Sequence, residues 1–278
     1  MFTIEQLGSW SRIVEFPVTR DRIAAYAAAT NDLTPQHVDG TVAPPVFAVV
    51  PGFEVMAEAT LGVAPPEAAS RILHGRHDIH VTRPIVPGDL LRCRAQVIGV
   101  HARSSGVAVT TLLETTGAAG DPVNEQYFTG FFRGATHSGD AGHTAPDHSA
   151  DPQASADVPE LAVTQHIDTD QPRRYAEASG DFMPVHLDDA FARKVGLPGV
   201  IVHGLCTMAF TSHALAGGTG LGDPTRLRRL AVRFSAPAFP GRAITTNAWR
   251  IGGNRYCFET VSDDGAQVIK DGLAEYTA

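Results

Sequence analysis

An aspartate and a histidine five residues apart are the side chains of this 278-residue chain best suited to acid–base chemistry. Asp181 and His186 lie in the segment YAEASGDFMPVH, which covers residues 175–186. A carboxylate and an imidazole can hold one water molecule between them and move its protons, and each such transfer typically contributes about 10²–10⁴ in rate. Pro184 makes this segment irregular, so both side chains can converge where a regular helix would separate them. The segment therefore predicts activation of water.

Both residues also have structural explanations. Gly-Asp pairs are common turn formers, so Asp181 could serve as a turn or capping residue, and His186 alone could be a hydrogen-bonded core histidine. Their combination with Pro184 favours the catalytic interpretation. Ser179 is interpreted as structural, because its surroundings do not resemble a nucleophile elbow.

A carbonyl-binding group is expected at the start of the apolar segment 200–215. The first N–H groups of a helix are free and carry partial positive charge. Gly204 has no side chain, so a carbonyl oxygen could approach its N–H closely. His203 precedes it, and it could either contact a substrate or hold the active-site loop.

The same spacing of Tyr, Asp, Pro and His occurs a second time. Residues 26–37 read YAAATNDLTPQH, and each of the four residues lies 149 positions before its counterpart in 175–186. Prolines at 44, 84 and 87 match prolines at 198, 237 and 240 in the same order. We infer an internal duplication of a unit of roughly 130 residues.

The first copy keeps Asp32 and His37 but differs around them. Asn31 replaces Gly180, and valines at 49 and 50 stand where His203 and Gly204 stand in the second copy. Valine would crowd an approaching carbonyl, and Pro51 should distort the helix after its first turn. We expect this half to be inactive and to line an acyl-chain tunnel. A second active site at Asp32 and His37 is the alternative.

Each copy predicts one apolar helix and a set of antiparallel strands, because β-branched runs with period-2 alternation follow the helix. Such a sheet would wrap around its helix, and two units side by side would form one continuous sheet of an α+β fold. The expected domains are 1–133 and 159–278, called here the first half and the second half. The expected helices are 21–30, 46–61, 171–179 and 200–215, and the expected strands are 72–81, 90–100, 106–114, 125–133, 227–235, 243–251, 255–262 and 267–276.

Residues 134–158 contain almost no large apolar side chains, so we expect a flexible linker between the halves. Its histidines, His137, His143 and His148, do not preset a metal geometry. The net charge of −8 argues against nucleic acid, and no segment is apolar enough to cross a membrane. The N-terminus does not read as a signal peptide. Three scattered cysteines suggest reduced thiols in a cytoplasmic protein.

The second copy resembles the signature of the MaoC-like, R-specific enoyl-CoA hydratases and dehydratases. The resemblance implies a double hot-dog fold and a lyase that adds water to a 2-enoyl thioester of coenzyme A or acyl carrier protein, in fatty acid or polyketide metabolism. It implies an (R)-3-hydroxyacyl product, with no cofactor and no metal, and the Gly204 amide as carbonyl donor. Met183 departs from the asparagine usual in that family. The matching residues are Tyr175, Ser179, Gly180, Asp181, Pro184, His186, His203 and Gly204.

Partners and rival functions follow from weaker signals. Arg226, Arg228 and Arg229 could bind the phosphates of the carrier, or could form a solvated basic edge. A hot-dog thioesterase would need an acidic residue on the buried helix, where Glu54 and Glu58 lie. An inactive acyl-thioester-binding protein is the non-enzyme alternative, suggested by Met183. The chain could also assemble as a homodimer.

Overall fold

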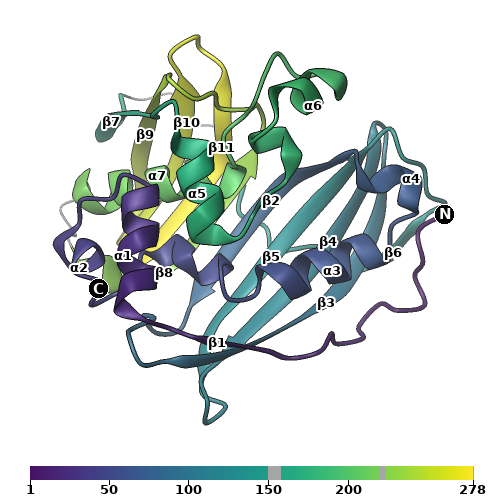
Figure 1. Ribbon diagram of the computed structural model, residues 1–278, viewed down its shortest axis with the longest axis horizontal. Helices are drawn as coiled ribbons and strands as arrows, with labels where there is room; N and C mark the ends of the chain where they lie inside the picture. Colours follow the sequence, from purple (N-terminus) through teal and green to yellow (C-terminus); the bar gives the residue numbers. More distant parts are fainter. Residues whose placement is uncertain (150–157, 219–222, 278) are drawn as a thin grey trace.

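The computed structural model describes residues 1–149, 158–218 and 223–277, and its strands form one continuous antiparallel sheet (Figure 1). The alternating runs of both halves pair in the order β1-β3-β4-β5-β2-β8-β11-β10-β9-β7, and β6 pairs with β3. The strands are β1 Val14–Pro17, β2 Ile72–Val81, β3 Leu90–Arg103, β4 Gly106–Thr116, β5 Pro122–Arg133, β6 Asp140–Gly142, β7 Leu161–His166, β8 Leu227–Phe234, β9 Ala243–Gly252, β10 Arg255–Ser262 and β11 Gln267–Tyr276.

The two halves join through β2 and β8, which pair antiparallel with Asp78 opposite Ala231. Arg229 donates to both carboxylate oxygens of Asp78, at 3.1 and 2.8 Å, across this seam. Both side chains are buried or nearly so, and such a bidentate pair fixes the register of the strands. The prediction of a double hot-dog with one continuous sheet is therefore confirmed.

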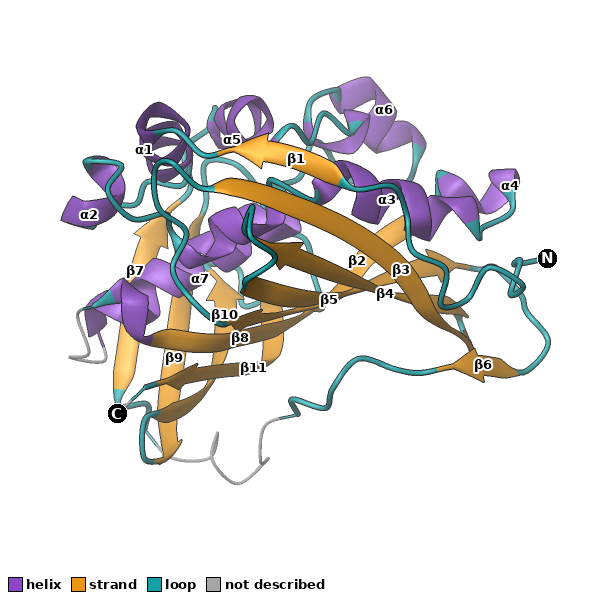
Figure 2. Cartoon of the chain, turned by 90° about the horizontal axis from the view of Figure 1, so that it is seen from below, coloured by secondary structure: helices purple, strands orange, loops and turns teal. Residues whose placement is uncertain are grey.

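The helices lie on one face of the curved sheet (Figure 2). The expected helix over 46–61 is divided into η1 and α3, because Pro51 and Gly52 interrupt it as the sequence predicts. The second-half helix begins at Gly204, four residues later than expected. The helical elements are α1 Arg20–Ala29, α2 Pro35–Val38, η1 Pro45–Val49, α3 Phe53–Gly62, α4 Pro66–Ala69, α5 Gln171–Ser179, η3 Pro184–His186, α6 Asp189–Lys194, α7 Gly204–Gly218 and η4 Pro224–Arg226.

The duplication is visible in how each main helix meets the sheet. Thr60 of α3 bonds the hydroxyl of Thr111 at 2.7 Å, and Thr211 of α7 bonds Thr260 at 3.0 Å. All four side chains are buried. The hydroxyl pairs satisfy polar groups that would otherwise be costly in the core, in the same way in both halves.

The segment expected to be a flexible linker is partly ordered. Its residues 140–142 form β6 against β3, and His148 is buried and donates from Nδ1 to the Asp271 carbonyl at 2.7 Å. Backbone pairing does not need apolar side chains, which is why composition alone misses it. Residues 150–157 lie outside the described residues. No helix in the described part of the chain is long and apolar enough to cross a bilayer.

Candidate active site

The end of α5 turns the chain so that Asp181 points into the protein. Gly180 adopts φ +82° as the C-cap of α5, a conformation that glycine adopts without strain. The Asp181 N–H then donates to Ser179 Oγ at 3.3 Å, and Asp181 Oδ1 accepts the Met183 N–H at 3.1 Å. Asp181 is 9% exposed. Ser179, Gly180 and Met183 therefore shape the loop that carries the carboxylate.

His186 is held from the opposite side by the backbone that leads into α7. Pro184 starts the short helix η3, and His186 Nδ1–H donates to the Ile201 carbonyl at 2.9 Å. With the proton on Nδ1, the lone pair of Nε2 is free to accept a hydrogen bond. The ring is therefore fixed in the tautomer that a base requires.

His203 completes the cluster just before α7 begins. Its Nε2–H donates to the Asp181 carbonyl at 3.0 Å, and its ring stacks on His186 with centroids 3.8 Å apart. Tyr175 packs against His203, with the centroids of the two rings 4.8 Å apart. These contacts favour the expectation that His203 holds the active-site loop.

Asp181, His186 and His203 present nitrogen or oxygen atoms within 4.8 Å of one another. One water molecule can bridge such a gap, since each hydrogen bond is about 2.8 Å long. A metal ion fits less well. Ligand lone pairs lie in the imidazole planes, and the two rings are stacked at 27°, so their lone pairs do not converge. The geometry suits water.

Burial sets the electrostatics of this pair. It raises the pKa of Asp181, and the nearby His186 only partly offsets this. Burial lowers the pKa of His186, although the charge of Asp181 raises it in part. Burial and then the charge of His186 lower the pKa of His203 to about 3. Both imidazoles are therefore neutral at neutral pH, and Asp181 is a stronger base than an exposed carboxylate.

The carbonyl site predicted at Gly204 lies at the first residue of α7. Its N–H is among those that a helix leaves without an internal partner. A Cβ atom at this position would lie 3.3 Å from the ring of Phe234 at the end of β8. Only glycine leaves the space between this amide and Phe234 open, and sequence reasoning did not identify Phe234.

The first-half pair is arranged differently. His37 Nδ1–H donates directly to Asp32 Oδ2 at 2.7 Å, and both side chains are almost completely buried. Burial raises the pKa of Asp32, but the hydrogen bond and charge of His37 outweigh it and leave the pKa below its usual value. Val49 is 1% exposed and ends η1, whereas α3 begins only at Phe53. The imidazole and the carboxylate of the first half therefore bind each other.

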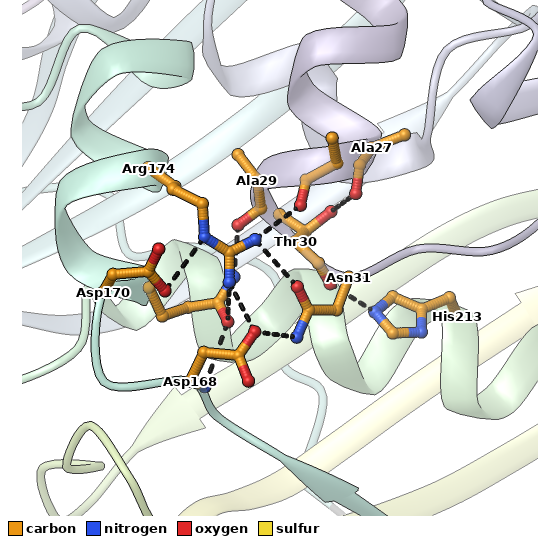
Figure 3. A network of polar contacts seen from close by, with 10 residues as sticks. Ala27, Ala29, Thr30, Asn31, Asp168, Asp170, Arg174 and His213 are labelled. Carbon is orange, nitrogen blue, oxygen red and sulfur yellow. Dashed lines mark hydrogen bonds and ion pairs between the residues drawn. The ribbon is translucent and has the colours of Figure 1, made fainter.

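Side chains from the second half also clamp the first-half loop (Figure 3). Arg174 donates from Nη1 to the Ala28 carbonyl at 2.9 Å and to Asn31 Oδ1 at 3.0 Å. His213 Nε2–H donates to the Thr30 carbonyl at 3.0 Å. Asn31 adopts φ +53°, and its amide binds Asp168 at 3.0 Å. This network satisfies the last carbonyls of α1.

A cavity of about 420 Å³ lies beside this clamped loop. It reaches α7, whose Phe210 and His213 form part of its wall, and no sequence motif indicated these two residues. It is lined by Asn31, Asp32, Leu33, Thr34, Gln165, His166, Phe210 and His213. The expectation that this cavity receives an acyl chain stays a prediction.

The arginines expected to bind carrier phosphates lie at the start of β8, whereas Phe234 beside Gly204 lies at its end. Arg229 is paired with Asp78 at 2.8 Å, and a carrier contact by Arg229 stays a prediction. Arg226 donates to the Thr277 carbonyl, and Arg228 to those of Thr225 and Leu227. Carrier contacts by Arg226 and Arg228 stay a prediction.

The acidic residues that a thioesterase would need are turned away from the buried side of α3. Glu54 and Glu58 are more than half exposed, and both bind Arg12. A carboxylate in that position cannot activate water beside a buried thioester. The geometry therefore disfavours the thioesterase alternative.

Known proteins resemble both halves. Residues 151–271 match the family model of the MaoC like domain, and residues 5–126 match the FAS1-like dehydratase domain region. The chain is 31% identical over 245 residues to the 3-hydroxyacyl-thioester dehydratase Y of Mycobacterium tuberculosis, covering 84% of this chain and 81% of that one. It is 24% identical to the probable enoyl-CoA hydratase 2 of Dictyostelium discoideum, over 94% and 92% of the two chains. A MaoC-like dehydratase structure from Phytophthora capsici superposes with a TM-score of 0.86, at 26% identity and 98% coverage of both chains.

Proposed function

This chain belongs to the MaoC-like dehydratase family, and we propose that it is a lyase acting on 2-enoyl and (R)-3-hydroxyacyl thioesters through Asp181 and His186. The enzyme adds water across the double bond of the 2-enoyl thioester, and in the reverse reaction it removes water from the 3-hydroxyacyl thioester. The thioester carrier is coenzyme A or acyl carrier protein. The single observation that carries the proposal is the water-sized gap between a basic carboxylate and a neutral imidazole.

The chemistry follows from the hydrogen-bonding capacity of the two groups. A water that donates one hydrogen to Asp181 and the other to His186 Nε2 keeps an oxygen lone pair free to attack C3 of the enoyl group. Negative charge then develops on the thioester oxygen, where the Gly204 N–H donates to it. The pair delivers the proton taken from water to C2, so that the elements of one water molecule are added across the double bond.

The first half contributes a wall, not a second set of catalytic groups, in this proposal. Its Asp32 and His37 are hydrogen-bonded to each other and its helix start carries Val49 and Val50. The proposed domains are 1–133 and 159–278, joined by 134–158. The three cysteines are buried and form no disulfide within the described residues, which supports a reducing compartment such as the cytoplasm.

Crotonyl-CoA tests the proposal. Wild-type protein should remove the enoyl absorbance without releasing a thiol, and chiral analysis should give the (R)-3-hydroxy product. His186→Ala should lower kcat/KM by about 10²–10⁴. Release of free CoA with the double bond intact would instead establish a thioesterase, and binding of enoyl thioesters of several chain lengths without turnover would establish a binding protein.

A further inference from the structure

The end of α1 in the first half is bound by both helices that carry the proposed site (Figure 3). The backbone carbonyls of residues 28, 29 and 30 each accept a hydrogen bond from a second-half side chain, at 2.9, 2.5 and 3.0 Å. The donors are, in that order, Arg174 and Gln171 of α5 and His213 of α7. A helix leaves its last carbonyls without internal partners, so they are free to accept these donors. The end of α1 therefore joins α5 to α7.

The guanidinium group of Arg174 extends this contact to the loops on either side. It donates to Asn31 Oδ1 at 3.0 Å, and it forms ion pairs with Asp168 at 2.5 Å and Asp170 at 3.1 Å. The amide of Asn31 in turn donates to Asp168 at 3.0 Å, which closes a ring of contacts. The charge of Arg174 is therefore compensated within the fold, and the group holds α5 against the end of α1.

The proposed site lies at the ends of the same two helices. Asp181 directly follows the C-cap of α5, and Gly204 is the first residue of α7. Tyr175, the residue after Arg174, packs against His203 with ring centroids 4.8 Å apart. His203 then donates to the Asp181 carbonyl at 3.0 Å. Because a helix moves as a rigid element, a tilt of α5 would displace Tyr175 and Asp181 together.

The contacts at the end of α1 have no equivalent at the related positions of the other half. The offset of 149 residues between the duplicated segments relates Arg174 to Ala25. The buried threonines of the two main helices are 151 positions apart (211 − 60), and this offset relates His213 to Gly62. Alanine and glycine have no side-chain donor, so these positions cannot bind the end of α5 in return. The support runs from the first half to the proposed active half.

We propose that Arg174 is a positioning residue for the acid–base pair, through which the end of α1 fixes the place of Asp181. The inference rests on the proposed function, since it concerns the same pair. The first half then contributes to turnover without contacting the reacting atoms. It does so by holding the helix that leads into the catalytic loop.

Arg174→Met tests this role, because it keeps the aliphatic part of the side chain and removes the guanidinium group. With crotonyl-CoA, kcat should fall by about 10- to 100-fold while KM changes by less than about threefold, because a displacement of about 1 Å at the reacting groups is costly. Arg83→Met is the matched control. Arg83 is 32% exposed, binds two aspartates and donates to a backbone carbonyl, as Arg174 does at 31% exposure. In this control, kcat should change by less than about threefold.

Asn31→Gly is a milder test of the same link. Asn31 adopts φ +53°, which glycine accepts without strain, so only the side-chain contacts to Arg174 and Asp168 are lost. We expect kcat to fall by about three- to tenfold, the effect of one neutral hydrogen bond. Combined with Arg174→Met, it should add less than about twofold, because both changes break the same contact.

NMR signals of two histidines test the positioning independently of turnover. The rings of His186 and His203 stack with centroids 3.8 Å apart, so each ring shifts the proton signals of the other. These signals are assigned by comparison with His186→Ala and His203→Ala. Arg174→Met should move them toward the values of an exposed histidine, and Arg83→Met should leave them in place.

The two readouts together decide the outcome. Unchanged histidine signals and a kcat no lower than that of Arg83→Met, in folded protein, would overturn the inference. A loss that falls on KM alone would also overturn it, because Arg174 would then act on substrate binding. Altered signals in a protein that does not hydrate crotonyl-CoA would support the positioning and overturn the proposed lyase activity alone. If Arg174→Met does not fold, Asn31→Gly decides by the same two readouts.

Discussion

The two Asp–His pairs of this molecule have the same spacing and opposite geometry. In the first half, His37 donates directly to Asp32, and both side chains are buried. In the second half, His186 donates to the Ile201 carbonyl and His203 donates to the Asp181 carbonyl, so the reactive atoms remain available to a water. A carboxylate and an imidazole that bind each other stabilise the fold, whereas a pair held apart by backbone groups can bind a water molecule between its side chains.

The surroundings of each loop explain this difference. Arg174 and His213 clamp the first-half loop at the end of α1. The second-half loop turns at Gly180 and is held by the ring of His203. Identical spacing in sequence therefore does not distinguish the two halves, whereas the partners of the imidazole nitrogens differ between them.

Asp32→Ala should have the largest effect on stability. It removes one partner of a buried hydrogen-bonded pair and leaves the other partner unsatisfied, which typically costs about 1–3 kcal/mol. The lowered pKa of Asp32 means that this contribution exists above the pKa of an unfolded carboxyl and is lost as pH falls through the lower folded value. Denaturant unfolding at neutral pH measures it.

Asp181→Ala is the matched control for stability. Burial raises the pKa of Asp181, so its charged form does not favour the folded state at neutral pH. Its removal should leave the free energy of unfolding unchanged or slightly higher. A larger loss for Asp181→Ala than for Asp32→Ala would reverse the roles assigned to the two halves.

Gly204→Val should lower kcat/KM for crotonyl-CoA by about 10²-fold, the usual effect of losing one preorganised carbonyl donor. The reason is steric, since a Cβ there already reaches Phe234 at 3.3 Å. Phe53 begins α3 seven residues before Thr60, as Gly204 begins α7 seven residues before Thr211, so Phe53→Gly is the matched change in the first half. It should alter turnover by less than about threefold, because the thioester carbonyl is not expected to lie there. Comparable losses in both variants would contradict the assignment of the carbonyl site.

The smallest expected effect is a shift in the acid limb of the pH profile of kcat/KM. The reactive form has Asp181 ionised and His186 neutral, so acid removes activity by protonating the coupled pair. Because burial raises the pKa of Asp181 and lowers that of His186, the acid limb should lie above the usual carboxyl value of about 3.9 and below the usual imidazole value of about 6.5. An acid limb at or above the imidazole value would show that His186 is not held neutral.

Sequence predicted much of this arrangement because its signals are local. Proline, glycine and period-2 alternation mark the main strands and helices, and Pro51 correctly predicts the break between η1 and α3. The short strands β1 and β7 were missed because four and six residues give too little pattern. β6 was missed because a polar segment can still pair through its backbone.

The contacts that could not be predicted join residues distant in sequence. Arg229 binds Asp78, which lies 151 residues away in the sequence, and no motif indicates this pairing. The sequence shows the duplication. It does not show that His37 binds its own aspartate whereas His186 binds the Ile201 carbonyl.

The central claim is that one Asp–His pair of the two carries catalysis. The most direct measurement is kcat/KM for crotonyl-CoA hydration in Asp181→Asn and Asp32→Asn, which change the same group at related positions. The account predicts a loss of about 10²–10⁴ for Asp181→Asn and less than about fivefold for Asp32→Asn. Equal large losses in folded protein would establish two active sites, and a loss confined to Asp32→Asn would place the chemistry in the first half.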